Sequence, residues 1–228
     1  MTWVERKVMA RLQTRFGPNR VGPFGLLHPL AVGIKLIFKE ELVPARADRI
    51  IFFLAPMLTV VPALMLFAVI PAGGEVNAAG KTISFSLSDI NVGVLYILAI
   101  ASIAVYGIAL AGWASNNKYA LLGGMRATAQ MLSYELPLAL AIVGVLLLSG
   151  SMRLSDIVQR QWQTVQISGS DISIWFVFLQ PIAAFIFLIT ALAETNRAPF
   201  DLPEAEQELT AGYHTEYSGM KYALFFMA

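Results

Sequence analysis

The sequence predicts an all-α polytopic membrane protein, a transmembrane helix bundle with an interfacial amphipathic helix and a long acidic inner loop. The 228 residues are 57% hydrophobic and only 14% charged, whereas about a quarter of the residues of an average soluble protein are charged. Several apolar stretches are long enough to cross a bilayer, and the basic residues gather on one side of them. We therefore expect a single membrane domain over residues 1–228.

Four apolar stretches reach the length of about 20 residues that a helix needs to span the hydrocarbon core. They cover residues 50–71, 92–114, 127–149 and 172–193. A further apolar segment covers residues 217–228. The sequence thus predicts four transmembrane helices and the start of another.

Ahead of the first span, residues 25–42 indicate an amphipathic helix that lies in the membrane interface. Apolar side chains recur there at helical spacing, at Leu27, Leu30, Ile34, Ile37 and Phe38. Three polar side chains are displaced from that stripe, His28, Lys35 and Lys39. The alternative is a first soluble helix packed on a domain core, but the sequence shows no other soluble core.

Two polar connections carry weaker signals. Residues 81–87 alternate between polar and apolar side chains, which is typical of a short strand, here on the outer side of the membrane. Residues 151–170 are polar and predict a short surface helix.

The distribution of lysine and arginine predicts the orientation, because cytoplasmic loops retain these residues. If residues 1–49 face inside, that side holds twelve of the 16 basic residues: Arg6, Lys7, Arg11, Arg15, Arg20, Lys35, Lys39, Arg46, Arg49, Lys118, Arg126 and Arg197. The outer side holds Lys81, Arg153 and Arg160. We therefore expect a multi-pass protein of the bacterial plasma (inner) membrane, with its acidic loop on the cytoplasmic side.

Composition narrows the chemistry of the chain. The formal net charge is +1, which gives no indication of nucleic-acid binding. The chain has no cysteine and only two histidines, His28 and His214. Disulfides and thiolate-bound iron–sulfur clusters are therefore excluded, and a metal or haem site is poorly supported. Any electrons handled near this chain must travel on another subunit or on a ligand.

The most distinctive feature is a run of carboxylates directly after the fourth span, Asp201, Glu204, Glu206 and Glu208. Carboxylates this close together repel one another and resist losing water, so we expect some of them to exchange protons near neutral pH. Helical spacing would place Glu204 and Glu208 on one face with Asp201 near, whereas an extended chain would align the three glutamates. A proline at 203 favours a helix that begins around Glu204.

Such a charged run usually indicates a solvated surface loop. Here Glu194 precedes it at the end of a span, and Glu216 follows it at the start of the next helix. Acids at both membrane boundaries favour a proton relay over a plain surface loop.

A further carboxylate, Glu135, lies inside the third span. A carboxylate at such depth costs on the order of 3 kcal/mol unless it faces water, a partner or the interior of the bundle. Glu135 is therefore a candidate site residue, with Arg126 nearer the inner surface as a partner through water. The alternative is a structural glutamate that is permanently paired.

Two basic motifs lie near the beginning of the chain. A rigid turn of glycine and proline carries Arg15 and Arg20, a pattern suited to binding an anionic headgroup or another subunit. Glu5 precedes Arg6 at a membrane edge, where snorkelling alone would account for the base.

Together these segments resemble the membrane subunit called H of bacterial respiratory complex I, an NADH:quinone oxidoreductase (subunit 1 in mitochondria). Residues 199–212, with their continuation to Lys221, resemble the signature loop of that family. Residues 5–7, 17–23 and 133–135 resemble its other motifs. The match runs over essentially the whole chain.

The resemblance implies an eight-helix subunit whose inner loops help to form the quinone entry channel against the peripheral arm. Its buried acids would begin the proton path, so that quinone reduction is coupled to proton translocation. Quinone would be the substrate, while NADH, FMN and iron–sulfur clusters would belong to partner subunits. The expected partners are the peripheral-arm subunits of the quinone site, adjacent membrane subunits and lipid. No metal and no complete redox site are expected in this chain alone.

The resemblance also implies roles by motif position. The proton path would comprise Glu135, Glu194, Asp201, Glu204, Glu206, Glu208 and Glu216. The quinone channel or a subunit interface would comprise Glu5, Arg6, Arg15, Arg20, Lys35, Arg126, Arg197 and His214. For His214, a hydrogen bond to a quinone carbonyl and a purely structural role remain alternatives.

The chain departs from the family pattern in the amphipathic segment, where His28 and Val32 replace a usual glutamine and aspartate. The resemblance therefore assigns no proton or quinone role to position 32. Against the eight-helix pattern, we expect a chain that begins where the first spanning helix ends and stops early in the sixth.

Two other classes of protein remain as alternatives. One is the homologous subunit of an energy-converting hydrogenase, although the intact segments 199–209 and 213–221 favour the quinone enzyme. The other is a freestanding cation/proton antiporter. A basic inner surface without a soluble domain argues instead for docking to a neighbouring subunit.

Overall fold

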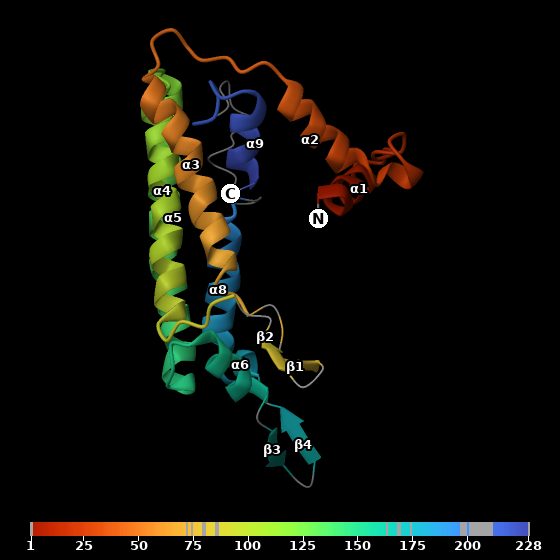
Figure 1. Ribbon diagram of the computed structural model, residues 1–228, viewed down its shortest axis with the longest axis vertical. Coiled ribbons are helices and arrows are strands. Elements are labelled where there is room, and N and C mark those ends of the chain that lie inside the picture. Colours follow the sequence, from red (N-terminus) through yellow and green to blue (C-terminus); the bar gives the residue numbers. More distant parts are fainter. Residues whose placement is uncertain are drawn as a thin grey trace.

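The computed structural model describes residues 2–71, 73, 75–78, 81–84, 87–162, 164–167, 170–173, 175–196, 200 and 212–227. A bundle of long helices runs the length of the molecule (Figure 1), made by α3 (Arg49–Phe67), α4 (Gly93–Ala114), α5 (Lys118–Ser149) and α8 (Pro181–Glu194). In this bundle α3 packs against α4, α4 against α5, and α5 against α8. Helices α3, α4 and α5 are long and apolar enough to cross a membrane. The all-α fold class is thus confirmed.

Local sequence signals set the ends of these helices. Asp48 caps α3, where its Oδ1 accepts a hydrogen bond from the backbone N–H of Ile50 at 3.1 Å. Asn117 caps α5 in the same way, through a 3.0 Å bond from the N–H of Tyr119. Gly150 ends α5 with φ 66°, a left-handed conformation that glycine adopts without strain. Helix α5 therefore begins at Lys118, well before the predicted start at 127.

Small residues let the helices approach closely. A Cβ atom added to Gly107 of α4 would lie 2.5 Å from Cγ2 of Thr59 and 2.9 Å from the carbonyl oxygen of Ala55, both on α3. Gly112 of α4 and Gly124 of α5 approach each other in a similar manner. Around these contacts lies the core, formed by Phe52, Ala55, Ile108, Ala111, Ala114, Ala127, Tyr213, Tyr217 and Phe225.

The region predicted as the fourth span begins differently in the structure. Residues Ser170–Ser173 form a strand, β4, and the helical part is divided into α7 (Phe176–Leu179) and α8. The division falls at Gln180, which has φ −130° and ψ 64° because the following proline disfavours the helical conformation. The prediction of one continuous helix over 172–193 is corrected accordingly.

The N-terminal segment lies to one side of the bundle (Figure 1) and consists of α1 (Thr2–Leu12), a 3-10 turn (Pro23–Gly25) and α2 (His28–Phe38). Helix α2 is shorter than the predicted 25–42, since Lys39 already has an extended backbone. None of its residues is buried. It packs against α1 and against α9 (Gly219–Met227), and α9 in turn packs against α3.

The opposite end of the bundle carries two antiparallel hairpins and a short helix (Figure 1). The hairpins are β1 (Glu75–Ala78) with β2 (Lys81–Ser84), and β3 (Thr164–Ile167) with β4. The polar stretch after α5 holds the predicted surface helix, α6 (Leu154–Trp162). Of the strand predicted over 81–87, residues 81–84 form β2, and residues 85 and 86 lie outside the described residues.

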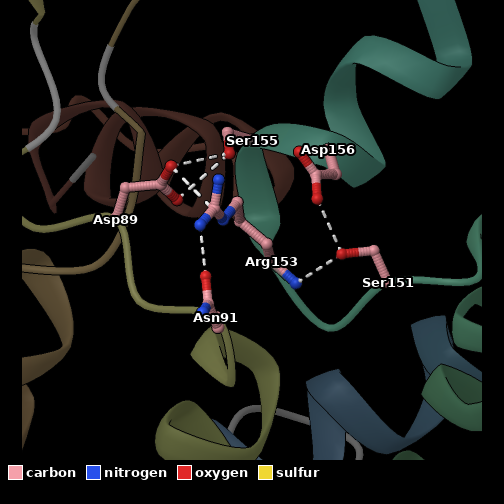
Figure 2. A network of polar contacts seen from close by, with 6 residues as sticks. All are labelled: Asp89, Asn91, Ser151, Arg153, Ser155 and Asp156. Carbon is pink, nitrogen blue, oxygen red and sulfur yellow. Dashed lines mark hydrogen bonds and ion pairs between the residues drawn. The ribbon is translucent and has the colours of Figure 1, made fainter.

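A polar network joins the loop before α4 to the start of α6 (Figure 2). The side chain of Arg153 makes an ion pair with Asp89 at 3.6 Å and donates a hydrogen bond to Asn91. Ser155 donates to the same aspartate at 3.0 Å. These contacts fasten the α5–α6 connection to the β2–α4 loop at this end of the molecule.

Candidate proton-transfer site

Glu135 lies on α5 and is half-buried within the bundle. The hydroxyl of Ser102, on the neighbouring helix α4, donates a hydrogen bond to its Oε1. That hydroxyl also lies 2.9 Å from the carbonyl oxygen of Leu98, an alternative acceptor for its single proton. The carboxylate is therefore held by one hydroxyl that has two possible acceptors.

Glu194 ends α8, where burial and, to a lesser degree, the negative charge of Glu135 raise its pKa. It is half-buried in the structure. Two carboxylates that interact in this way do not ionise independently, because the charge on one favours the protonated form of the other. Helices α5 and α8 thus bring two acids near each other.

Gln130 ties the helix that carries Glu135 to the helix that carries Glu194. Its buried side-chain amide donates to the carbonyl oxygens of Ala193 at 3.2 Å and Phe200 at 2.8 Å. Its Oε1 is buried and has no hydrogen-bond partner in the described part of the chain. The ring of Phe200 also meets the ring of Tyr134 edge to face, with centroids 5.3 Å apart.

Glu216 lies in the turn before α9, apart from the Glu135–Glu194 pair in the chain. Its Oε1 accepts a 2.8 Å hydrogen bond from Nδ2 of Asn117, the residue that caps α5. The side-chain oxygen of Asn117 therefore caps α5, and its side-chain nitrogen donates a hydrogen bond to Glu216. The carboxylate is half-buried at the end of the bundle where α3 and α5 begin.

Aromatic side chains fix this turn to the bundle. The ring of Tyr217 stacks on Phe52 of α3, with centroids 4.1 Å apart and an interplanar angle of 5°. Burial raises the pKa of Tyr217, so its hydroxyl stays protonated at physiological pH. His214 contacts the rings of Tyr213 and Tyr222, with centroids 5.1 and 5.4 Å apart. These ring contacts hold His214 in the turn.

The N-terminal site residues form a separate group. Arg6 Nη1 lies 2.5 Å from Nε2 of His28, which joins α1 to α2. The side chains of Arg15, Arg20 and Lys35 are exposed. Because α1 and α2 lie to one side of the bundle (Figure 1), the structure does not bring this group together with Glu135.

The remaining predicted residues are placed as follows. Glu5 and Arg126 have exposed side chains on α1 and α5. Five predicted site residues lie outside the described residues: Arg197, Asp201, Glu204, Glu206 and Glu208.

Three site residues were missed in the sequence, namely Ser102, Gln130 and Asn117. Ser102 interrupts an otherwise apolar helix, which was an available signal that this position faces a polar group. Gln130 stands five residues before Glu135 in the same helix, and its burial follows from the α5–α8 packing. Asn117 was recognisable as a helix cap, but its second contact depends on the distant Glu216.

The chain matches known proteins along its whole length. A family model described as NADH dehydrogenase matches residues 1–228. The H subunit of NADH-quinone oxidoreductase from Thermomicrobium roseum is 54% identical over 228 residues, covering 100% of this chain and 67% of that protein. The H subunit from Protochlamydia amoebophila is 55% identical over 227 residues, with the same coverage. One of the H subunits from Geobacter sulfurreducens, numbered 2, is 54% identical, and the chain covers 66% of its length.

The whole of this chain aligns with these relatives, and it spans about two thirds of their length. The full-length match to the family model and identities above half lead to one conclusion. This chain belongs to the NADH dehydrogenase family, and the relatives described above are the H subunits of NADH-quinone oxidoreductases.

Proposed function

We propose that this chain is a membrane subunit of a proton-pumping NADH:quinone oxidoreductase, in which it lines part of the quinone channel and begins the proton path. The names of its relatives support this enzyme over a hydrogenase or an antiporter. Quinone would be the substrate, and the redox cofactors would be held by partner subunits. The acidic loop would face the cytoplasm, as the excess of basic residues at that end favours.

The observation that carries the proposal is the pair of carboxylates inside the helix bundle. Glu135 and Glu194 come from different helices, and their charges interact. Ionised groups within membrane helices are expensive, and they are retained mainly where they move protons or ions. The pair is suited to take up one proton and release it when a nearby charge changes.

The proposed mechanism is electrostatic. Reduction of a quinone near the acidic loop would change the charge and the demand for protons there. Added negative charge favours protonation of neighbouring carboxylates, so protons would shift among the loop acids and Glu216, and then to Glu194 and Glu135. Ser102 would orient the receiving carboxylate.

A groove on α1 supports the quinone part of the proposal. It has a volume of about 490 Å³ and is lined by Trp3, Val8, Leu12 and Phe24, with Lys7 and Arg11 completing it. An apolar wall of this kind suits the hydrocarbon tail of a quinone, and the bases suit polar groups at the membrane edge.

The test is Glu135→Gln in the complete enzyme, because glutamine keeps the shape of glutamate and cannot ionise. In inverted membrane vesicles we expect NADH-driven proton uptake to fall by about tenfold or more, the scale of a lost proton-transfer group. Glu194→Gln should give a fall of the same kind. Fluorescence quenching of a pH-sensitive dye measures proton uptake, and NADH oxidation measures turnover.

Asp156→Asn provides the matched control, since this carboxylate lies in the network at the opposite end of the bundle. It should leave proton uptake and quinone reduction within about twofold of the parent enzyme. The proposed role of Glu135 is wrong if Glu135→Gln leaves both rates unchanged in correctly assembled enzyme.

A further inference from the structure

The segment that joins α2 to α3, residues 39–47, is fastened at one point to the start of α9. Ser218 Oγ accepts a 3.0 Å hydrogen bond from the N–H of Leu42 and lies 3.2 Å from the carbonyl oxygen of Glu40, to which it can donate. Gly219 follows with φ 61°, and a Cβ atom there would lie 3.0 Å from the carbonyl oxygen of Lys39. The two backbones therefore approach closely at this point.

A buried lysine makes a second attachment between the same two segments. Lys221 Nζ lies 3.0 Å from Oε2 of Glu41, and the lysine side chain is only 6% exposed, against 42% for the glutamate. The ammonium also lies 3.6 Å from the centroid of the Phe53 ring of α3, a cation–π contact.

This lysine occupies an unfavourable position. It lies in the first turn of α9, where the helix dipole opposes a positive charge, and its burial removes it from water. Well-packed apolar residues often replace a buried ion pair with equal or greater stability. A charged residue kept at such a place therefore points to a role besides stability.

The same end of α9 is directly connected to Glu216. Only Tyr217 separates Glu216 from Ser218, and Tyr217 is stacked on Phe52. Glu216 itself is bonded to Asn117 at the start of α5. A shift of the 39–47 segment that pulls on Ser218 or Lys221 would thus reach the turn that carries this carboxylate.

The other end of the segment is anchored independently. The N–H of Asp48 bonds the carbonyl oxygen of Ala114 at 3.2 Å, and Nδ2 of Asn116 bonds that of Arg46 at 3.2 Å. Residues 39–45 therefore lie between helix α2 and this anchor at the start of α3, and the two attachments to α9 lie within them. Helix α2 also contacts α9 directly.

We propose that Lys221 and Glu41 form a latch that couples the position of the interfacial helix α2 to the position of Glu216. Lys221 is then a positioning residue, which acts on proton transfer through the turn before α9. This inference rests on the proposed function, because it assumes that Glu216 belongs to the proton path. It adds a connection between the α1–α2 side of the molecule and the acids of the bundle.

The first test compares two neighbouring acids in the assembled enzyme. Glu41→Gln removes the partner of Lys221, whereas Glu40→Gln removes an equal charge from the adjacent side chain, which is exposed and uses only its backbone in the attachment. In inverted vesicles we expect Glu41→Gln to lower the protons taken up per NADH oxidised by about twofold or more. Glu40→Gln should leave this ratio unchanged. Equal ratios in the two variants would overturn the latch.

The second test separates positioning from stability. Lys221→Met keeps an unbranched side chain in the buried site. If the lysine were purely structural, a Lys221→Met enzyme with normal heat stability would take up protons as the parent enzyme does. The latch predicts lowered proton uptake per NADH in Lys221→Met enzyme of normal heat stability, and recovery in Lys221→Arg. Full proton uptake in Lys221→Met enzyme would overturn the proposal.

Glu216→Gln in the same vesicles distinguishes failure of the latch from failure of the proposed function. If Glu216→Gln lowers proton uptake while the Glu41 and Lys221 variants do not, the latch is wrong and the proton path stands. If Glu216→Gln has no effect, the role of Glu216 in the path is wrong, and the latch falls with it.

Discussion

At the residue scale, the environment of Glu135 depends on a single hydroxyl. Among the described residues, Ser102 supplies the hydrogen bond to this carboxylate. A carboxylate among membrane helices is costly to charge, so each hydrogen-bond donor that stabilises its charged form matters. Small changes at Ser102 should therefore have large effects on proton transfer.

We expect Ser102→Ala to lower NADH-driven proton uptake by about tenfold, since loss of a hydrogen bond to a charged group amounts to roughly 1.5–3 kcal/mol. Ser102→Thr retains the hydroxyl and should retain most of the activity. The matched control is Ser133→Ala, because the Ser133 hydroxyl bonds the carbonyl oxygen of Ala129 at 2.7 Å on an exposed face of α5. Equal uptake in the Ser102→Ala and Ser133→Ala enzymes would contradict this role of Ser102.

At the element scale, small residues let helices α3, α4 and α5 of the bundle approach one another closely. Its core is rich in alanine, and glycines lie where α3, α4 and α5 meet. Small residues at membrane helix interfaces permit tight van der Waals packing where no hydrophobic effect drives association. The positions of Glu135 and Ser102 relative to each other follow from this α4–α5 packing.

Gly107→Ala should destabilise the bundle, because the added methyl group would lie 2.5 Å from Thr59 and 2.9 Å from a backbone oxygen of α3. Overpacking of this kind typically costs about 1–3 kcal/mol. Gly33→Ala in α2 is the control, since no atom lies within 4 Å of the position of its added Cβ. We expect the temperature of heat inactivation to fall for Gly107→Ala and to stay equal or rise for Gly33→Ala. The reverse order would contradict the packing.

The sequence allowed the long helices to be predicted, because apolar length and the caps at Asp48 and Asn117 are local signals. It did not reveal the break at Gln180 or the strand β4. Polar Asp171 and Ser173 alternate with apolar Ile172 and Ile174, a strand pattern that the apolar average of the longer stretch concealed. Among the site residues, each acid could be recognised singly in the sequence. The contact of Glu216 with Asn117 could not be predicted, because it depends on the tertiary fold and not on local sequence.

At the scale of the whole molecule, the two ends of the bundle differ in charge. Arg49 and Lys118 begin α3 and α5 at the end that also holds Glu216. Arg153 and Arg160 lie at the opposite end, where Arg153 is paired with Asp89 (Figure 2). Residues 1–49, which lead into α3 at the first end, hold nine basic residues including Arg49. Because cytoplasmic loops retain lysine and arginine, this excess predicts that the first end faces the cytoplasm.

The absence of cysteine from the chain makes this orientation directly testable with single introduced thiols. Lys118→Cys reports the end with Glu216, and Gln159→Cys reports the end with α6; both parent side chains are exposed. In intact cells, a membrane-impermeant maleimide should label the thiol at 159 and not the one at 118. Inverted vesicles should give the opposite result, and permeabilised cells should label both, which controls for coverage by partner subunits. Labelling at 118 in intact cells would place the acids on the outer side, where protons arriving from the cytoplasm would not reach them first.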